Sequence, residues 1–457
     1  MTRTTHPNSA GETTVDPSPA TLGEVHVETR HGCGVKPDEP GPQSLPATIV
    51  ERPSLDRIAR VVPGRSPFRI PLKTRYYARL LWHNPWLLTC NEKVRNYIRY
   101  KMTPRRVVVD TRKTAPVYCS VNVTQRCNLS CSFCIVGDWI NEPSWRKNEA
   151  TVSQMDRLLD HPVIRRCLYI MLVGGEPLIN RNIAEIVRRT KSRRHLVGMT
   201  SNGTLLADRL EELRSAGLDL INISLYEENK DALADILPIA TKRLHCKLIK
   251  VIGRRQLETP GLIEECVRFA RETGCGQIYF QNMLSPPANS KTARKAETRK
   301  RKQLLAAAQA ERSSTVAPPD DASSPTSLRV LADTVVNDTE PIYDDHEAYP
   351  SIQEEMARKY PDVRISWPAP VARIARRDRK RCRMPWYLLI TDIQGNQGFC
   401  CKQATCSGPN LYEVPPADVY NTPEWIQTRK ALLSTDTDAP AKCEGCFMLD
   451  DAWCSEM

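Results

Sequence analysis

The sequence predicts an α/β fold in which six strand–helix units build a parallel sheet. Six short apolar runs recur along the middle of the chain, at 117–124, 168–175, 196–202, 218–226, 244–252 and 277–284. Stretches with helical spacing lie between them, and this alternation is typical of parallel strands joined by right-handed crossovers. Six units are too few to close an eight-stranded barrel. We therefore expect a partial (β/α)6 barrel that stays open.

The stretches between these runs carry the signals of helices that cover such a sheet. Residues 182–191, 207–217 and 262–274 repeat apolar side chains every three or four positions. The last two end in glycine, which commonly stops a helix because it adopts the left-handed conformation. In folds of this kind the chemistry lies where the strands end. Residues that directly follow the strands are therefore the candidate site.

Composition divides the chain into five parts. The predicted core is flanked by a segment rich in Pro, Thr, Ser and Gly, by a basic linker, and by a tail in which cysteines become dense. The expected parts are a disordered tail (1–66), a helical arm (67–115), the barrel core (116–290), a basic linker and connecting region (291–380) and a small C-terminal module supported by metal (381–457).

The helical arm has a distinct pattern over residues 73–102. Aromatic and aliphatic side chains fall on one face and Arg and Lys on the other, with a break near Pro85. We expect the arm to pack on the core, and a helix that lies on a membrane surface is the alternative. No run of about 18 apolar residues occurs, so no membrane span is expected.

Charge and cysteine content narrow the functional class. The 457 residues carry a formal charge of +12 and include 17 cysteines. The N-terminus lacks an apolar signal region, which predicts a cytoplasmic location. Clustered cysteines in a reducing compartment bind metal or carry out redox chemistry more often than they form disulfides. The basic excess lies in flanking runs without an aromatic nucleic-acid motif, so no nucleic-acid partner is expected.

Three cysteines lie within nine residues directly after the first strand, in the sequence RCNLSCSFC (126–134). They are Cys127, Cys131 and Cys134, spaced as CxxxCxxC. Thiolates suit zinc and iron–sulfur clusters alike. Zinc ribbons use two paired knuckles, and no second knuckle lies nearby in the sequence. A [4Fe–4S] cluster held by three cysteines leaves one iron open to a cofactor, which accounts for the odd number.

This pattern resembles the radical S-adenosylmethionine (SAM) enzymes, whose signature is CxxxCxxC after the first barrel strand. The resemblance implies that the open iron binds the amino and carboxylate groups of SAM. It also implies that an electron from the cluster cleaves the sulfonium and yields a 5′-deoxyadenosyl radical, which abstracts hydrogen from an unactivated C–H bond. The cofactor carries this chemistry, and the protein holds and shields it. A flavodoxin or ferredoxin is then expected as the electron donor.

Further motifs match that family in order along the chain. GGEP (174–177) ends the second strand, where the family binds the methionine amino group, and TSNG (200–203) ends the third. The resemblance assigns cofactor binding to Phe133, Gly174, Gly175, Glu176, Asn202 and Ser224. Each has a structural alternative, such as a plain strand-to-helix turn, a core aromatic or an ordinary strand serine. Lys250, near the end of the fifth strand, is a further candidate for the SAM carboxylate.

A second set of cysteines lies near the C-terminus. Pro-Trp after its first cysteine, the turn QGNQG and the pair CEGC resemble the SPASM and twitch modules appended to radical SAM enzymes. The resemblance implies that four thiolates close an auxiliary [4Fe–4S] cluster. The implied ligands are Cys382, Cys400, Cys443 and Cys446. A structural zinc site is the alternative.

The rest of the tail departs from the two-cluster SPASM pattern. The next ligand of that pattern would stand at position 452, which is Ala452. This difference favours the one-cluster twitch form. Cys401 is an alternative to Cys400 as a ligand. Cys406 and Cys454 are interpreted as spare thiols, a disulfide pair or a hydrogen-atom donor.

The resemblance implies an oxidoreductase or maturase. We expect a small-molecule substrate, such as a sugar, aminocyclitol or other secondary-metabolite intermediate in natural product biosynthesis, with net oxidation through the auxiliary cluster. Residues 1–115 lack the pattern of the β-rich leader-binding domain that peptide modifiers often carry. A maturase that crosslinks or epimerises a ribosomal peptide is the first alternative. A zinc-containing nucleic-acid-binding protein is the alternative from another class.

Overall fold

The computed structural model describes residues 72–102, 115–284, 340–371 and 382–449, with short gaps inside 130–148 and 399–448. All described residues belong to one compact unit. The predictions made for residues 1–66 and for the basic linker up to residue 339 lie outside the described residues. Cys401 and Cys454 also lie outside them.

In the part of the chain that the structure describes, nine strands form a single open sheet. Its order is β7-β6-β5-β4-β3-β2-β1-β8-β9, and every neighbouring pair is parallel except β8 and β9. The strands are β1 (Tyr118–Thr124), β2 (Tyr169–Gly174), β3 (Leu196–Ser201), β4 (Leu220–Ser224), β5 (Cys246–Ile252), β6 (Gln277–Asn282), β7 (Arg364–Ser366), β8 (Leu388–Asp392) and β9 (Gln397–Gly398). The α/β class, the six consecutive parallel strands and the open sheet are therefore confirmed.

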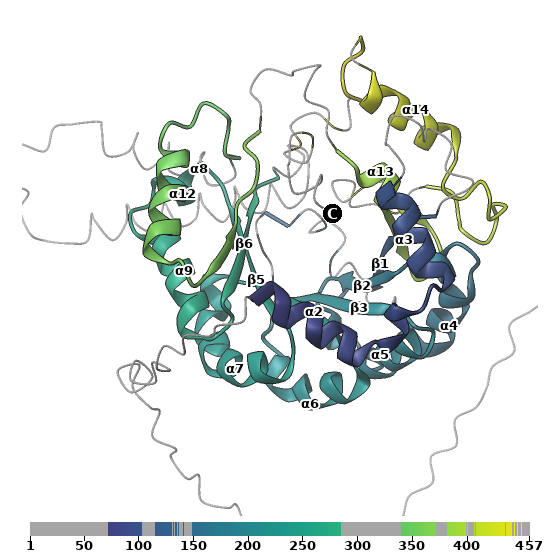
Figure 1. The fold of residues 1–457 in the computed structure, drawn as a ribbon, viewed down its shortest axis with the longest axis horizontal. Coiled ribbons are helices and arrows are strands. Elements are labelled where there is room, and N and C mark those ends of the chain that lie inside the picture. The colour runs from purple at the N-terminus through teal and green to yellow at the C-terminus, as the bar shows by residue number, and fades with distance from the viewer. Residues whose placement is uncertain are drawn as a thin grey trace, which may run out of the picture. The chain divides into compact units, whose positions relative to one another are not determined.

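Helices cover the outer side of the curved sheet, as Figure 1 shows for α4, α5, α6, α7 and α9. Gly217 ends α6 with a φ of 89°, as the sequence predicted for this glycine. The α-helices of this region are α4 (Val152–Asp160), α5 (Ile183–Ser192), α6 (Leu206–Ala216), α7 (Lys230–Arg243), α8 (Arg254–Glu258), α9 (Leu262–Glu272) and α12 (Ala348–Lys359). Short 3₁₀ turns are η3 (Ile164–Arg166), η4 (Pro177–Ile179) and η5 (Glu227–Asn229).

Three strands of the sheet, β1, β4 and β5, present one buried face and one partly open face. In β5, Leu248 and Ile252 are buried under the helices, whereas Lys247, Ile249 and Val251 are partly exposed on the inner face. β1 and β4 alternate in the same way. This period of two is what a strand with one packed face requires. The inner face of the sheet is therefore accessible to a ligand.

The cysteine-rich tail does not form a wholly separate module, because its first strand joins the core sheet. β8 lies beside β1 and parallel to it, with Tyr118 opposite Leu388 and Asn122 opposite Asp392. The predicted turn QGNQG is present between β8 and β9, and Gly395 has a φ of 90° there. Helices α13 (Met384–Tyr387) and α14 (Pro423–Leu433) flank this hairpin in the sequence.

A buried arginine fixes α14 against this region. Arg429 is fully buried and donates to the carbonyl of Pro385 (3.0 Å) and to Oδ1 of Asn421 (3.0 Å). Its guanidinium also lies over the ring of Tyr420, 4.8 Å from the centroid. A buried cation is tolerated when its donors are satisfied in this way. The end of the tail that precedes CEGC is thereby held next to α13.

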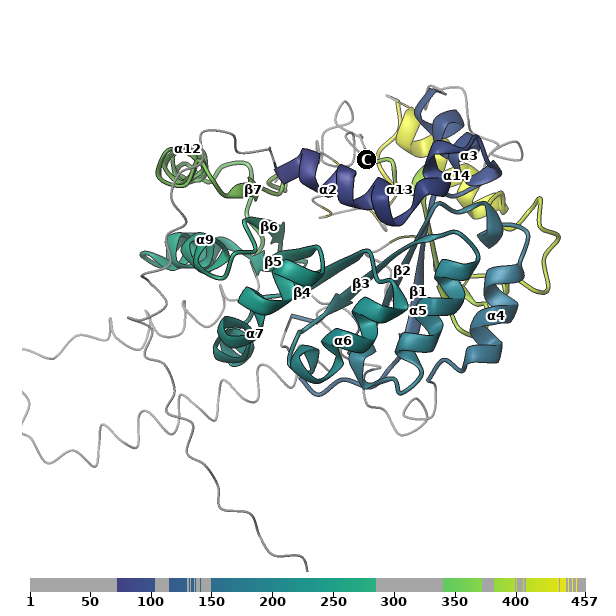
Figure 2. The ribbon, with the colours of Figure 1, turned by 60° about the horizontal axis from the view of Figure 1, so that its bottom comes forward.

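The N-terminal arm packs on the amino-terminal edge of the sheet, where α2, α3 and α13 lie on one side (Figure 2). It consists of α2 (Leu72–His83), η1 (Pro85–Leu88) and α3 (Glu92–Met102), so the predicted break at Pro85 is present. Two buried asparagines fasten it to the core. Asn84 donates to Oδ1 of Asp219 (2.9 Å), and Asn96 donates to the carbonyl of Ala115 (3.1 Å). Among the described residues, no helix is both long and apolar enough to cross a bilayer.

Candidate active site

The three-cysteine loop follows β1 at the carboxyl-terminal edge of the sheet, opposite the edge that carries the arm. Cys127, Cys131 and Cys134 are each partly buried. Burial, together with the neighbouring thiols of Cys134 and Cys127, raises the pKa of the Cys131 thiol to about 12. Burial also raises the pKa of Cys127. The three thiols therefore lie within one another's electrostatic field.

The chemistry of this donor set fits a thiolate-bound cluster. Buried neighbouring thiols hold their protons until a positively charged centre binds them as thiolates. An iron–sulfur cluster would supply that charge, with Cys127, Cys131 and Cys134 as its ligands. Within the described ranges, no group of three or more His, Cys, Asp and Glu side chains is already arranged so that it could hold a metal ion.

The two glycines of GGEP are required because the end of β2 packs directly against the start of the cysteine loop. A Cβ on Gly174 would lie 2.1 Å from the carbonyl oxygen of Thr124, and one on Gly175 would lie 2.2 Å from that of Arg126. The backbone N–H of Gly175 donates to the Thr124 carbonyl (2.9 Å). These glycines thus allow one backbone to approach another, and they fix where the cysteine loop begins.

Glu176 connects the loops after β1, β2 and β3. It is fully buried, and its backbone N–H donates to the carbonyl of Arg126 (2.7 Å). Its carboxylate accepts from the backbone N–H of Leu178 (3.0 Å), the hydroxyl of Ser201 (2.8 Å) and the backbone N–H of Asn202 (2.7 Å). Burial raises the pKa of this carboxyl, and the three donors oppose that rise. The contacts support the role of orienting the loop, rather than that of holding an ammonium group.

Asn202 reaches the cysteine loop itself. Its Nδ2 donates to Oδ1 of Asn128 (2.8 Å), the residue after Cys127, and the Asn128 amide donates to the hydroxyl of Thr204 (2.8 Å). The Asn202 backbone carbonyl accepts from Nδ2 of Asn229 (2.6 Å), which belongs to the turn after β4. Asn202 therefore links the third and fourth strand ends to the first thiol ligand. The TSNG turn therefore lies beside the cysteine loop, and sequence reasoning missed Asn128 and Asn229.

An aromatic pair borders the second and third cysteines. The rings of Phe133 and Tyr226 lie 5.7 Å apart at 46°. The Tyr226 hydroxyl forms hydrogen bonds with the Cys131 thiol and with the Ser224 hydroxyl. Ser224 thus reaches the cysteine loop through Tyr226. Sequence reasoning missed Tyr226, although it stands two residues after Ser224 at the end of a strand, the position at which site residues are expected.

Two lysines of β5 have opposite placements. Lys250 shares the buried face of Leu248 and Ile252, and its ammonium lies 3.6 Å from the carboxylate of Glu227. This face and this ion pair do not support its suggested role at the SAM carboxylate. Lys247 lies on the inner face, where burial and the nearby Arg364 lower its pKa to about 8. The sequence identified no general base, and Lys247 is a candidate.

Two of the four expected auxiliary ligands are associated with the same apolar cluster. Cys382 is buried in an apolar cluster with Tyr387 and Leu388, and Cys446 packs against the same cluster. The backbone N–H of Cys446 donates to the carbonyl of Cys443 (3.2 Å), which shapes the CEGC turn. Cys400 follows β9 and is partly buried.

Cys406 lies elsewhere, against the inner strands. The Asn122 amide donates to its sulfur (3.7 Å) from β1. Burial and the carboxylate of Asp392 together raise the pKa of this thiol to about 12. A protonated thiol beside an inner-face side chain fits the suggested spare thiol or hydrogen-atom donor better than a thiolate ligand.

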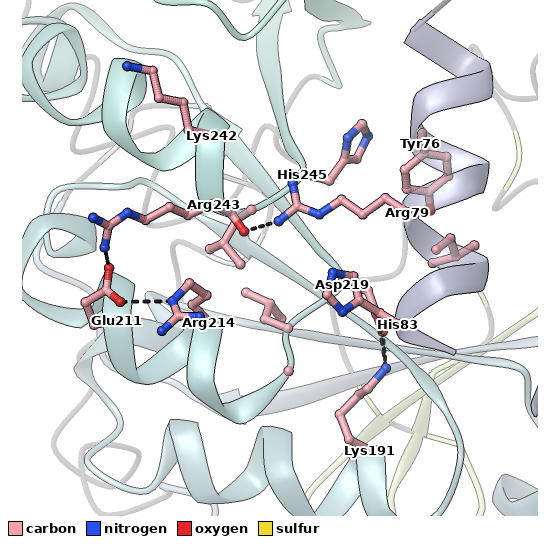
Figure 3. Close-up of a pocket in the computed structure, with 14 residues that line it drawn as sticks. Tyr76, Arg79, His83, Lys191, Glu211, Arg214, Asp219, Lys242, Arg243 and His245 are labelled. Atoms are coloured by element: carbon pink, nitrogen blue, oxygen red, sulfur yellow. Dashed lines mark hydrogen bonds and ion pairs between the residues drawn. The ribbon is translucent and has the colours of Figure 1, made fainter. Parts of the chain in front are cut away.

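A cavity of about 600 Å³ lies at the opposite edge of the sheet, between α2 and the amino-terminal ends of β4 and β5 (Figure 3). Most of its charges are paired with one another. The contacts are Lys191 with Asp219 (2.8 Å), Arg214 with Glu211 (2.9 Å), Arg243 with Glu211, and Arg79 with the Arg243 carbonyl. His245 stacks on Tyr76 at 4.2 Å, and burial lowers its pKa to about 4. This cavity lies where the arm packs on the core, and it is not the catalytic site.

A protein-family comparison identifies the core of the chain. The family model described as the radical SAM superfamily matches residues 121–259, which hold the cysteine loop, GGEP, TSNG and the turn after β4.

Relatives of known name match over the same core. A GTP 3′,8-cyclase of Marinobacter nauticus is 39% identical over 184 residues, which are 36% of this chain and 54% of that protein. Molybdenum cofactor biosynthesis protein 1 of Drosophila melanogaster is 37% identical over 122 residues, or 26% of this chain and 21% of that protein. The chain therefore spans about half the length of the relatives or less.

Solved structures show a weaker likeness. SuiB of Streptococcus suis bound to S-adenosylmethionine aligns with a TM-score of 0.48 and 14% identity, covering 81% of this chain and 87% of that one. BtrN in complex with AdoMet and 2-DOIA aligns with a TM-score of 0.34 and 13% identity, covering 70% of this chain and 87% of that one. Likeness at this level does not transfer a substrate.

Proposed function

This chain is an enzyme of the radical SAM superfamily, and we propose that it abstracts hydrogen from an unactivated C–H bond of a small-molecule substrate. The observation that carries the proposal is the three-cysteine loop, which the GGEP and TSNG loops hold at the carboxyl ends of the strands. A bound [4Fe–4S] cluster and SAM would supply a 5′-deoxyadenosyl radical there. The family match leaves the zinc-containing nucleic-acid-binding alternative without support.

Different residues of the protein have different roles in the proposed reaction. Cys127, Cys131 and Cys134 would hold the cluster, and Glu176 and Asn202 keep their loop in place. The glycines at the end of β2, Phe133 and Ser224 are proposed to bind SAM. Cys382, Cys400, Cys443 and Cys446 are proposed to hold the auxiliary cluster, which would accept an electron from the substrate and so permit net oxidation. A flavodoxin or ferredoxin is the proposed electron donor.

The polar side chains on the inner face of the sheet favour a polar small molecule as the substrate. Thr200, Asn222 and Lys247 lie side by side in register on β3, β4 and β5, and all three are partly exposed. Ser120 and Asn122 extend this polar surface on β1. Hydroxyl, amide and amine groups of this kind recognise hydroxyl groups of a sugar or aminocyclitol. Lys247 is placed to accept the proton that an alcohol loses when it is oxidised.

The test of this function is anaerobic incubation with SAM, a reductant and deuterated candidate substrates. Release of 5′-deoxyadenosine, with deuterium transferred from a sugar or aminocyclitol, is the expected result. Two clusters predict about eight irons per chain. Transfer from a ribosomal peptide alone would favour the maturase alternative. Protein that contains iron but never cleaves SAM would contradict both.

Replacing Tyr226 with phenylalanine is expected to make the midpoint potential of the three-cysteine cluster more negative. The change removes the hydroxyl that donates to the Cys131 sulfur, and hydrogen bonds to cluster sulfurs raise the potential. The expected shift is about 40 mV, the one-electron equivalent of about 1 kcal/mol for one hydrogen bond. A redox titration followed by electron paramagnetic resonance measures it. Phe133→Leu, which keeps the hydroxyl, is the matched control. An unchanged potential in Y226F would contradict the contact.

Replacing Lys247 with methionine is expected to stabilise the protein at pH 7 and to lose that advantage as the pH rises. The pKa of Lys247 is about 8 in the folded protein and near 10.4 when unfolded, so folding favours the neutral amine. The charged form therefore destabilises the fold below about pH 8, by at most about 3 kcal/mol, and this cost disappears towards pH 10. Urea unfolding at several pH values measures the difference. Lys242→Met, at an exposed lysine of α7, should show no such dependence.

A further inference from the structure

The large apolar side chains that the described residues leave exposed are concentrated in the arm. Trp82, Leu88 and Met102 are exposed to 83%, 76% and 78%. The full set in the arm is Tyr77, Leu81, Trp82, Leu88, Ile98 and Met102, and in the rest of the described chain only Ile239 joins them. Single exposed apolar residues are ordinary, but a gathering of this kind marks an interaction surface.

These side chains form the outer face of an arm whose inner face is anchored. On α3, Arg95, Ile98, Arg99 and Met102 are all exposed, and their spacing places them on one helical stripe. On α2, Tyr77 and Leu81 are one turn apart and Trp82 is beside them. On α3 the buried Asn96 lies away from this stripe, and the buried Asn84 directly follows α2; both asparagines bind the core. The outward direction of the apolar residues is therefore fixed by the packing of the arm.

The charge of this outer face has one sign. Residues 76–102 contain five Lys or Arg side chains and one acidic residue, Glu92. Glu92 pairs with Arg166 of the core at 3.2 Å. Arg95 and Arg99 are exposed between Ile98 and Met102. The outer face thus combines exposed apolar and aromatic side chains with positive charge and presents no unpaired carboxylate.

We propose that this outer face docks the enzyme on an anionic membrane surface, with the arm lying in the interface. Tryptophan and tyrosine favour the boundary between lipid headgroups and acyl chains, and leucine and methionine enter the apolar layer beneath. Arginine and lysine bind anionic headgroups. Pairing of two copies through this face would oppose like charges across a twofold axis. Lipid therefore complements the face better than a second copy does. This inference goes beyond the proposed function.

The test is flotation of the full-length protein with lipid vesicles. Vesicles of phosphatidylcholine alone are compared with vesicles that also contain phosphatidylglycerol. The protein is expected to float with the anionic vesicles, to bind less as salt is raised, and to bind neutral vesicles weakly. The double variant Trp82→Ser, Leu88→Ser should lose binding by at least about tenfold, because two side chains no longer enter the apolar layer. Arg95→Glu combined with Arg99→Glu should abolish the preference for anionic lipid.

Ile239→Ser is the matched control, because Ile239 is an exposed apolar residue of α7 outside the arm. It should bind vesicles as the unchanged protein does. Iron content and SAM cleavage in solution should be unchanged in all these variants, so the docking proposal and the proposed function can fail separately. Absence of flotation, or equal loss in I239S, would overturn the proposal. A dimer in solution that W82S dissociates would also overturn it, because a second copy would then cover this face.

Discussion

Cys131→Ala is expected to abolish SAM cleavage and to remove about half of the iron, since one of the two proposed four-iron clusters would be lost. The cluster would keep only two of its three thiolate ligands, Cys127 and Cys134. In the unchanged protein the Cys131 thiol is partly buried and close enough to both for their thiols to raise its pKa. Anaerobic reconstitution, iron analysis and measurement of 5′-deoxyadenosine give the result. Cys127→Ala and Cys134→Ala should behave in the same way.

Cys90→Ala is the control for this experiment, because Cys90 is exposed in the arm and far from the loop in the fold. It should retain both iron and cleavage. Substantial cleavage by C131A would refute the assignment of the three-cysteine loop. Complete loss of iron from C131A would instead show that the auxiliary cluster is absent or depends on the first, which contradicts two independent clusters.

Gly175→Ala is expected to prevent binding of the iron–sulfur cluster, although the substitution adds only one methyl group. The new Cβ would lie 2.2 Å from the carbonyl oxygen and 2.6 Å from the carbonyl carbon of Arg126, and 3.1 Å from Cβ of Cys127. Because the obstructing atoms are backbone, the start of the cysteine loop has to move. Overpacking of this kind costs about 1–3 kcal/mol. We expect a large loss of iron at the three-cysteine site and a correspondingly large loss of SAM cleavage.

Gly198→Ala is the matched control for Gly175→Ala, because an added Cβ at Gly198, a glycine of β3, would also meet a close neighbour. Its added Cβ would meet Cε of Met171 at 2.6 Å, the end of a flexible side chain that can turn away. G198A should therefore keep its iron. Iron analysis and thermal unfolding of both variants separate a local effect on the loop from general unfolding. Full iron in G175A would show that the contact between β2 and the loop does not position the thiols.

Much of the site follows from local sequence. The order of six strands and their helices can be predicted from apolar runs and from glycines that end helices. Each of these signals extends over only a few residues. The thiols of CxxxCxxC are neighbours in the chain, so their grouping needs no tertiary information. GGEP and TSNG are also local, and the structure places both beside the cysteine loop.

Other features depend on contacts between distant segments. Glu176 binds Ser201 and Asn202 across two strand ends, and Tyr226 reaches Cys131 from the turn after β4, 95 positions later in the chain. The reason GGEP needs glycines is a contact with Thr124 and Arg126, which the sequence does not reveal. Such side chains look ordinary in isolation, because their role comes from the partner that the fold brings to them.

The sequence by itself determined the class of fold, the three-thiol loop and the superfamily, because each of these is encoded in short-range spacing. Tertiary structure alone decided that the tail contributes a strand beside β1, that Lys247 faces inward and Lys250 does not, and that the arm buries Leu80 but leaves Trp82, Leu88 and Met102 exposed. These outcomes depend on which surfaces meet when the sheet is assembled. Periodicity reveals that a segment has two faces, but only packing decides which face is buried.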